Sequence, residues 1–214
     1  MARGFLDIAG TPSVKAAQAA NGVAMRSTTG EARTEPRRLT AAEAQFIAAR
    51  DSFYLATVSE TGWPYVQHRG GPPGFLRVID DSTLAFADFR GNRQYISLGN
   101  VAANDRVALL LMDYANRRRL KIYARIEARD LKAEPQLAEA LALPGYRAKP
   151  ERLFVLHLEA FDWNCPQHIT PRFTEQEIAA AFAPVRARIT QLEAENKMLR
   201  DKLGFVKGEG NAQR

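Results

Sequence analysis

Apolar and polar positions alternate with a period of two through much of the middle of the chain. The clearest example is Leu120–Ala128, in which every second residue is apolar and Lys, Tyr, Arg and Glu lie between them. Such alternation is typical of a strand with one buried face. Six other runs are strand-like: Ser52–Ser59, Trp63–Gln67, Phe75–Ile79, Thr83–Ala87, Arg106–Met112 and Leu153–Phe161. Their hairpin spacing predicts an antiparallel barrel and not a parallel sheet.

Helical patterns occur outside and between these runs. Val14–Ala20 is rich in alanine and predicts a short helix near the N-terminus. Thr40 and Glu43 have the spacing of a capping box, which predicts a helix ending near Arg50. Leu131–Leu143 is also expected to be helical.

A separate amphipathic helix is predicted at the C-terminal end, where Thr174 and Glu177 form another capping box. Its apolar residues alternate in spacings of four and three, and Asn196 occupies one slot of the series Val185, Ile189, Leu192, Leu199 and Leu203. A single Asn at such a position favours a parallel two-stranded coiled coil. The alternative is a helix that packs on its own domain with Asn196 at the rim. Both interpretations remain open from the sequence.

Composition and charge narrow the classes of function. The net charge is +6, but residues 41–170 hold 16 basic and 15 acidic side chains, so the excess lies at the two ends. Nucleic-acid-binding domains gather positive charge on one folded face, and we therefore expect no nucleic-acid partner. No apolar run is long enough to cross a membrane, and the N-terminus lacks a secretory pattern. With Cys165 as the single cysteine, we expect a cytoplasmic protein without an intrachain disulfide.

The most informative segment is Phe86–Asn100, where a strand-like run ends in a loop that contains Asn92, Arg93 and Gln94. Glycine in such a loop allows close approach of the backbone, amides donate hydrogen bonds, and arginine offers a charged fork. A second basic cluster around Arg69 ends an earlier strand. Two anion-binding corners on neighbouring strands predict a bound phosphorylated cofactor.

The chain resembles the pyridoxamine 5′-phosphate oxidase-like family of flavin-binding split barrels over Leu39–Arg172. The resemblance lies in the order of a capped helix and three segments, SFYLATVSETGWPYVQHRGG, TLAFADFRGNRQYISLGNVAANDRVALLLMD and DWNCPQHITPR. It implies a mainly β fold with flanking helices, built on an antiparallel six-stranded split β-barrel. The expected boundaries are an N-terminal arm at 1–38, the barrel at 39–172, the amphipathic helix at 173–206 and a tail at 207–214.

The resemblance also implies that the cofactor is flavin mononucleotide (FMN). By analogy with the family, Arg69 and the loop residues Asn92, Arg93 and Gln94 hold its phosphate, although Gln94 stands where a lysine is usual. Asp88 is expected to orient Arg93 or the ribityl chain. Ser97 and Asn100, on the helix that follows, are expected to have structural roles.

Other residues are expected to lie around the flavin ring. Gln67 shares a strand face with Arg69 and is expected at the ring edge, and Ala87 falls where the family's loop passes the ring. Trp163 is predicted to border the isoalloxazine, with a plain core position as the alternative. His168 is the candidate catalytic residue, as a proton donor or an anion anchor. Cys165 and His168 alone do not make a metal site.

These features together predict an FMN-dependent oxidoreductase that acts on a small substrate. Residues 166–172 lack the Arg-x-His pair with which the oxidase itself holds pyridoxal phosphate, so vitamin B6 oxidation is not expected. The family arrangement implies a homodimer with FMN at the subunit interface. The alternatives are a non-catalytic protein that stores or senses FMN, and a split barrel that uses haem or a deazaflavin.

Overall fold

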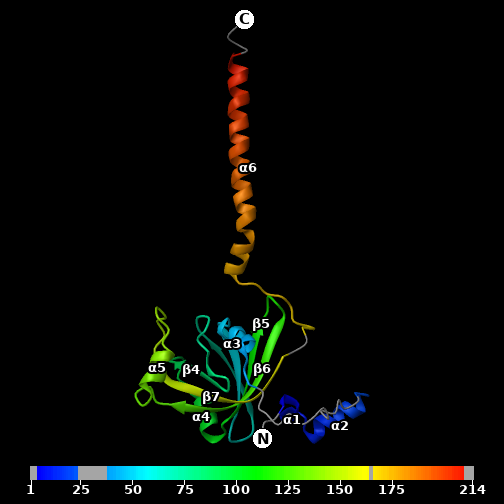
Figure 1. The fold of residues 1–214 in the computed structure, drawn as a ribbon, viewed down its shortest axis with the longest axis vertical. Helices are drawn as coiled ribbons and strands as arrows, with labels where there is room; N and C mark the ends of the chain where they lie inside the picture. Colours follow the sequence, from blue (N-terminus) through cyan, green and yellow to red (C-terminus); the bar gives the residue numbers. More distant parts are fainter. Residues whose placement is uncertain (1–3, 24–37, 164–165, 210–214) are drawn as a thin grey trace. The chain divides into compact units, whose positions relative to one another are not determined.

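The computed structural model describes residues 4–23, 38–163 and 166–209, and its centre is one antiparallel sheet (Figure 1). Seven strands form the sheet in this described part: β1 (Ser52–Val58), β2 (Pro64–Gly70), β3 (Arg77–Asp80), β4 (Thr83–Phe89), β5 (Arg106–Asp113), β6 (Arg118–Arg129) and β7 (Pro150–Trp163). Their spatial order is β2-β1-β5-β6-β7-β4-β3, and neighbouring strands are antiparallel throughout. The predicted mainly β, antiparallel class is confirmed.

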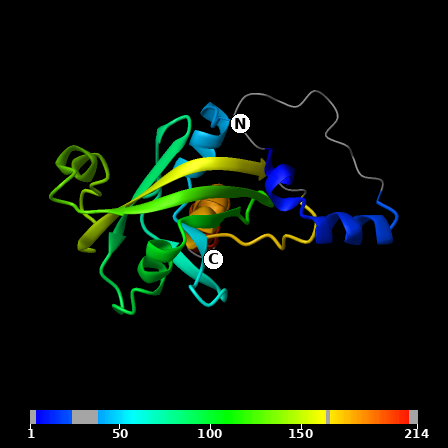
Figure 2. The ribbon, with the colours of Figure 1, turned by 90° about the horizontal axis from the view of Figure 1, so that it is seen from below.

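The sheet has one strand more than the six implied by the resemblance. The additional strand is short β3, which pairs only with β4 and forms one edge of the sheet. The opposite edge is β2, so the described strands form an open, curved sheet and not a closed barrel. The long strands β6 and β7 run side by side through its middle, as the green and yellow arrows of Figure 2 show.

The core lies on the concave side of the sheet and follows the predicted alternation. In β6, where alternation was predicted, Leu120, Ile122, Ala124 and Ile126 are buried while the residues between them are partly or fully exposed. The continuous apolar run of β5 alternates in burial as well. Phe53 stacks on Phe75 with ring centroids 5.5 Å apart, and these side chains pack with apolar residues of most of the other strands. Burial of this cluster supplies the main free energy that holds the sheet in its curved form.

Helix α3 (Ala41–Ala48) covers part of this core through Phe46 and Ile47. The predicted capping box is confirmed, because Thr40 and Glu43 exchange their hydrogen bonds at its N-terminus. Helix α4 (Ile96–Ala103) connects β4 to β5. Its Asn100 donates a hydrogen bond from Nδ2 to Oγ1 of Thr57 at 2.9 Å, so the structural role predicted for Asn100 is confirmed.

One helical prediction needs correction, and one helix was not predicted. The helix expected over Leu131–Leu143 is restricted to α5 (Pro135–Ala140), because the Asp130 carboxylate accepts the backbone N–H of Lys132 at 2.7 Å and holds a turn before the helix. In the arm, α2 (Pro12–Ala20) matches its prediction, but a further helix, α1 (Phe5–Ala9), precedes it. Phe5 of α1 stacks on Tyr123 of β6 at 4.6 Å.

The chain divides into two compact units, Met1–Thr170 and Pro171–Arg214. The second unit contains α6 (Glu175–Glu209), a helix of 35 residues. Thr174 and Glu177 form the predicted capping box, with the Thr174 N–H donating to the Glu177 carboxylate at 2.7 Å. Among the described helices, α6 included, none combines the length and apolar character needed to cross a bilayer.

Candidate functional site

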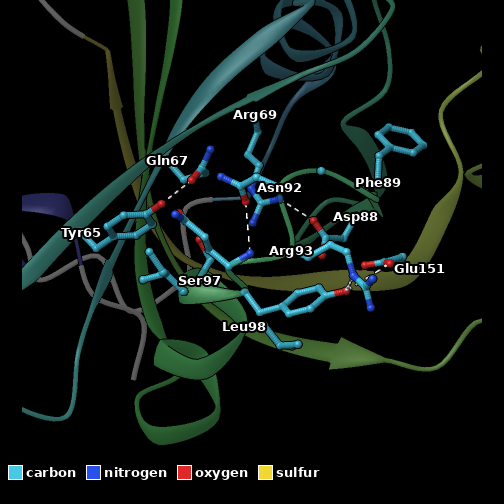
Figure 3. A pocket seen from close by; sticks show the side chains of 14 residues that line it. Tyr65, Gln67, Arg69, Asp88, Phe89, Asn92, Arg93, Ser97, Leu98 and Glu151 are labelled. Atoms are coloured by element: carbon cyan, nitrogen blue, oxygen red, sulfur yellow. Dashed lines mark hydrogen bonds and ion pairs between the residues drawn. The ribbon is translucent and has the colours of Figure 1, made fainter.

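A cavity of about 240 Å³ opens between the edge strand β2 and the end of β4 with the loop that follows it (Figure 3). Strand β2 forms one wall, and the end of β4 with the following loop and the start of α4 form the other. Its lining residues are Tyr65, Gln67, Arg69, Asp88, Phe89, Gly91, Asn92, Arg93, Gln94, Tyr95, Ile96, Ser97, Leu98 and Glu151. The two anion-binding corners predicted from the sequence are therefore parts of one cavity.

Asp88 is the buried centre of the ionic contacts in this cavity. Asp88 as a whole residue is 6% exposed, and its two carboxylate oxygens accept hydrogen bonds from Arg69 and Arg152 in two short ion pairs. Arg152 lies directly opposite Asp88 in the β4–β7 register, whereas Arg69 comes from β2. The carboxylate thus ties the β2 edge to the other side of the curved sheet. Asp88 was predicted to orient Arg93 or the ribityl chain; among the described residues, its carboxylate contacts Arg69 and Arg152 and not Arg93.

The Arg69 guanidinium packs on two aromatic rings, and its hydrogen-bonding capacity is not fully satisfied. Its Cζ lies 5.8 Å from the ring centroid of Phe86 and 5.7 Å from that of Phe154. One terminal nitrogen bonds to Asp88, but the buried Nε finds no hydrogen-bond partner among the described residues. Because a buried N–H without an acceptor costs free energy, this atom marks a place for an anionic ligand.

The loop after β4 is held in an unusual backbone conformation. Arg93 and Tyr95 have φ angles of 63° and 52°, in the left-handed region that residues other than glycine rarely adopt. The Asn92 side-chain oxygen accepts the N–H of Gln94 at 3.2 Å, and the Tyr95 hydroxyl donates to Glu151 at 3.2 Å. Strained residues of this kind concentrate at ligand-binding sites.

Arg93 is held at the solvent side of the cavity. Its Nε donates to the Tyr95 hydroxyl at 3.4 Å, and this bond, together with the nearby charge of Glu151, raises the pKa of Arg93. The guanidinium therefore stays charged over the whole physiological range. Figure 3 shows Arg93 and Asn92 on the loop side of the cavity, facing Arg69 and Gln67 on β2.

The N-terminus of α4 completes the cavity. Its N-cap residue, Tyr95, makes no capping hydrogen bond from its side chain, and the first three helical residues, Ile96–Leu98, line the cavity. Free amides at a helix N-terminus carry partial positive charge and bind anions. Ser97 is 4% exposed, and its Oγ has no hydrogen-bond partner within the described structure. Ser97 thus lies in the cavity wall, and within the described structure its Oγ makes no hydrogen bond that would support the predicted structural role.

Gln67 lies beside Arg69 on the face that was expected. The Tyr65 hydroxyl donates to its side-chain oxygen, and its Nε2 donates to the carbonyl of His68 at 3.2 Å. Ala87, by contrast, turns its side chain to the other face of β4, where it packs with Leu141 and Leu153 in a second apolar cluster. Strand alternation explains the difference, since Asp88 points into the cavity and its neighbour must point away.

Trp163 and His168 do not line this cavity within one chain. Trp163 packs edge to face on Phe46 at 4.7 Å and donates its indole N–H to Glu43 at 2.8 Å, which is the core position held open as the alternative. His168 is exposed and has a φ angle of 62°. Cys165 lies outside the described residues.

Sequence reasoning did not single out Tyr65, Tyr95 and Glu151, which line the cavity, or Arg152, which contacts Asp88. Glu151 and Arg152 come from the start of β7, and Arg152 is 64 residues from Asp88 in the sequence. Only the pairing of β4 with β7 brings them there, and a single sequence does not specify this register. Tyr65 could have been predicted from the sequence, because strand alternation places it on the same face as Gln67 and Arg69.

These residues meet the requirements of a phosphate. The cavity offers two guanidiniums, an uncapped helix N-terminus and two buried polar atoms that lack partners, Arg69 Nε and Ser97 Oγ. Phosphate oxygens accept several charge-assisted hydrogen bonds at once. The fold is therefore an open split-barrel sheet, and its cavity between β2 and β4 gathers the residues expected to bind an anion.

A family model described as pyridoxamine 5′-phosphate oxidase matches residues 39–162, which is more than half of the chain. The chain belongs to this family, and the resemblance stated from its motifs is confirmed. A comparison with curated protein sequences finds no match.

Several solved structures are similar in fold. A putative pyridoxamine 5′-phosphate oxidase from Lactobacillus delbrueckii is 22% identical, with 60% of this chain and 97% of that chain covered and a TM-score of 0.45. An FMN-binding protein from Syntrophomonas wolfei is 15% identical, with 56% and 81% covered and a TM-score of 0.43. An F420 reductase is 24% identical, with 54% and 93% covered and a TM-score of 0.37. Because these scores are low, the family assignment rests on the family model.

Proposed function

We propose that this protein is an FMN-binding flavoprotein, and that it acts as an oxidoreductase on a small substrate. The observation that carries the proposal is the pair of buried polar atoms without partners, Arg69 Nε and Ser97 Oγ, beside the uncapped N-terminus of α4. A doubly charged phosphate would satisfy both atoms and the helix amides together.

The chain's own residues divide into phosphate ligands and supports. Arg69, Arg93 and Ser97 would hold the phosphate, with Asn92 and Gln94 at its edge. Asp88 would keep Arg69 in place through their ion pair, and Arg152 balances the charge of Asp88 from the other side. This arrangement leaves Arg93 with its charge free of any carboxylate contact among the described residues, so the cavity keeps net attraction for an anion.

The flavin ring would extend past Tyr65 and Gln67, toward a face that a second copy of the chain would cover. An apolar patch lies on the outer face of β1, β2, β5 and β6, where Phe5 of α1 covers its Tyr123; the other members are Tyr54, Ala56, Val66, Ala108 and Leu110. Val66 is 60% exposed there. Large exposed apolar patches are typical of protein interfaces, which supports a homodimer with FMN at its interface. Trp163 and His168 would reach a flavin only in such an assembly.

When bound, FMN supplies the electron-transfer chemistry. The protein would orient the ring, exclude water from one of its faces and supply donors at its edge. Absence of the Arg-x-His pair from residues 166–172 argues against vitamin B6 as the substrate. A non-catalytic protein that stores or senses FMN is the alternative, and it needs the same binding site.

A titration that compares FMN with riboflavin tests the binding site directly. Riboflavin lacks the phosphate, so wild-type protein should bind FMN about 100-fold more tightly, as expected for two or more charge-assisted contacts. Arg69→Ala and Arg93→Ala should each weaken FMN by about 1.5–3 kcal/mol and leave riboflavin nearly unchanged. Flavin fluorescence quenching gives both dissociation constants.

Arg77→Ala provides the matched control, because Arg77 is an exposed arginine of β3 outside the cavity. Equal affinity for FMN and riboflavin would remove the phosphate assignment. Parallel titrations with haem and with a deazaflavin test the other ligands that split barrels use. Reduction of the bound flavin by a nicotinamide cofactor, followed by reoxidation in air, separates an oxidoreductase from a storage protein.

A further inference from the structure

Helix α6 carries a continuous apolar stripe that is exposed along its length. Eight apolar side chains between residues 178 and 203 are between 45% and 62% exposed: Ile178, Phe182, Val185, Ile189, Leu192, Met198, Leu199 and Leu203. All of them except Met198 follow one heptad series. Such an amount of exposed apolar surface on one helix is unfavourable in water.

We propose that α6 pairs with α6 of a second copy as a parallel, in-register two-stranded coiled coil. In this register Phe182, Ile189, Asn196 and Leu203 are a positions, and Ile178, Val185, Leu192 and Leu199 are d positions. The described helix thus extends the series well beyond the five apolar residues recognised from the sequence. It reaches more than three heptads, which is the length at which such pairs become stable.

Asn196 selects the parallel arrangement. In a parallel pair the two Asn196 side chains face each other, and each amide can donate to the other. In an antiparallel pair, a positions face d positions, so Asn196 would face an apolar side chain and leave its amide buried without a partner. A single Asn in an otherwise apolar seam therefore favours the parallel, two-stranded form.

The charged residues beside the seam indicate that the partner of α6 is a second copy of the same helix. In a parallel pair, each g residue faces the e residue five positions later on the other helix. Arg188 at g then faces Glu193, and Glu195 at g faces Arg200. Both pairs are attractive, and both sides of each pair come from this one sequence. Pro184 falls at the outer c position, away from the seam.

Disulfide trapping in the full-length chain tests the register. In a Cys165→Ser background, Leu199→Cys places a thiol at a d position, and Asp201→Cys places one at the outer f position two residues later. Mild oxidation should link the Leu199→Cys chains about tenfold faster than the Asp201→Cys chains, because only d positions meet across the seam. Equal rates at the two positions, or no linkage at either, would overturn the proposal.

Charge reversal tests the choice of partner. Glu195→Arg and Arg200→Glu, each added to the Leu199→Cys chain, should slow linkage about threefold or more by placing like charges across the seam. The combined swap restores opposite charges and should restore the rate. No rescue by the combined swap would contradict pairing between copies. These measurements need no flavin, so their outcome is independent of the proposed cofactor.

Discussion

Asp88 binds two guanidinium groups at once, and this shared carboxylate explains how Arg69 stays partly buried at the end of a strand. Arg69 and Arg152 contact different oxygens of Asp88, and all three side chains lie among aromatic residues. Removal of one partner from such a group would leave an uncompensated buried charge. The residues that prepare the site are therefore as important as those that would touch a phosphate.

Ser97 gives the sharpest test at the residue scale. Because its buried Oγ has no partner among the described residues, Ser97→Ala removes an unsatisfied group, and the free energy of unfolding should stay equal or rise slightly. The same substitution should weaken FMN binding by about 1 kcal/mol. Urea unfolding and flavin fluorescence measure the two effects.

Ser59→Ala is the control for this prediction, because the opposite pair of effects is expected for it. The Ser59 hydroxyl accepts the N–H of Trp63 at 3.1 Å in the β1–β2 turn, away from the cavity. Its loss should lower stability and leave FMN affinity unchanged. A Ser97→Ala variant that behaves in this way would show that Ser97 has only a structural role.

At the scale of elements, Glu43 connects the N-terminus of α3 to the end of β7. Burial raises the pKa of this carboxyl, but hydrogen bonds from Thr40 and from the Trp163 indole outweigh burial and hold its pKa below the ordinary value of 4.5. A carboxyl with a lowered pKa in the folded state contributes stability above the unfolded pKa. That contribution is lost as the pH falls below 4.5 and through the folded value.

Glu43→Gln should therefore lower the free energy of unfolding by about 1 kcal/mol at about pH 6, and the difference from wild type should shrink toward about pH 3. Other carboxyls with lowered pKa, such as Asp80 and Glu127, titrate equally in both proteins and cancel in the difference. Urea unfolding across this pH range provides the measurement. A difference that grows as the pH falls would refute the assigned direction.

At the scale of the whole molecule, the proposed homodimer would cover the apolar patch on β1, β2, β5 and β6 and would make the proposed cofactor site depend on a second copy. Val66→Arg places a charge at the β2 side of this patch and, since Val66 is 60% exposed, should leave the fold of one chain intact. We expect the variant to bind FMN at least about tenfold more weakly, because burial of a charge at an interface opposes association.

Ile79→Arg is the matched control, since Ile79 is 43% exposed on the edge strand β3 and lies outside the patch. Affinity, and not oligomeric state, is the informative measurement, because the coiled coil proposed for α6 would keep two chains together. Wild-type FMN affinity in Val66→Arg would show that the site is complete within one chain.

Local signals in the sequence were sufficient to predict the strands, two helix starts and several residues of the cavity. Strand-like runs, with period-two alternation in Leu120–Ala128 and a continuous apolar run in Arg106–Met112, located the seven strands. The capping boxes at Thr40 and Thr174 located two helix starts. Six of the predicted cofactor residues line one cavity: Gln67, Arg69, Asp88, Asn92, Arg93 and Gln94. These residues could be predicted from the sequence because each is adjacent to a strand end or a loop with recognisable chemistry.

Tertiary structure decided what depends on pairing between distant segments. The β4–β7 register brings Arg152 to Asp88, strand alternation and packing turn Ala87 away, and the contact with Glu43 draws Trp163 into the core. The charge of Asp88 is balanced by residues that lie 19 and 64 positions from it. The sequence determined the kinds of element and the chemistry of the loop, because these depend on neighbouring residues. The tertiary structure decided which side chains share the cavity, because that depends on how the sheet curves and closes over its core.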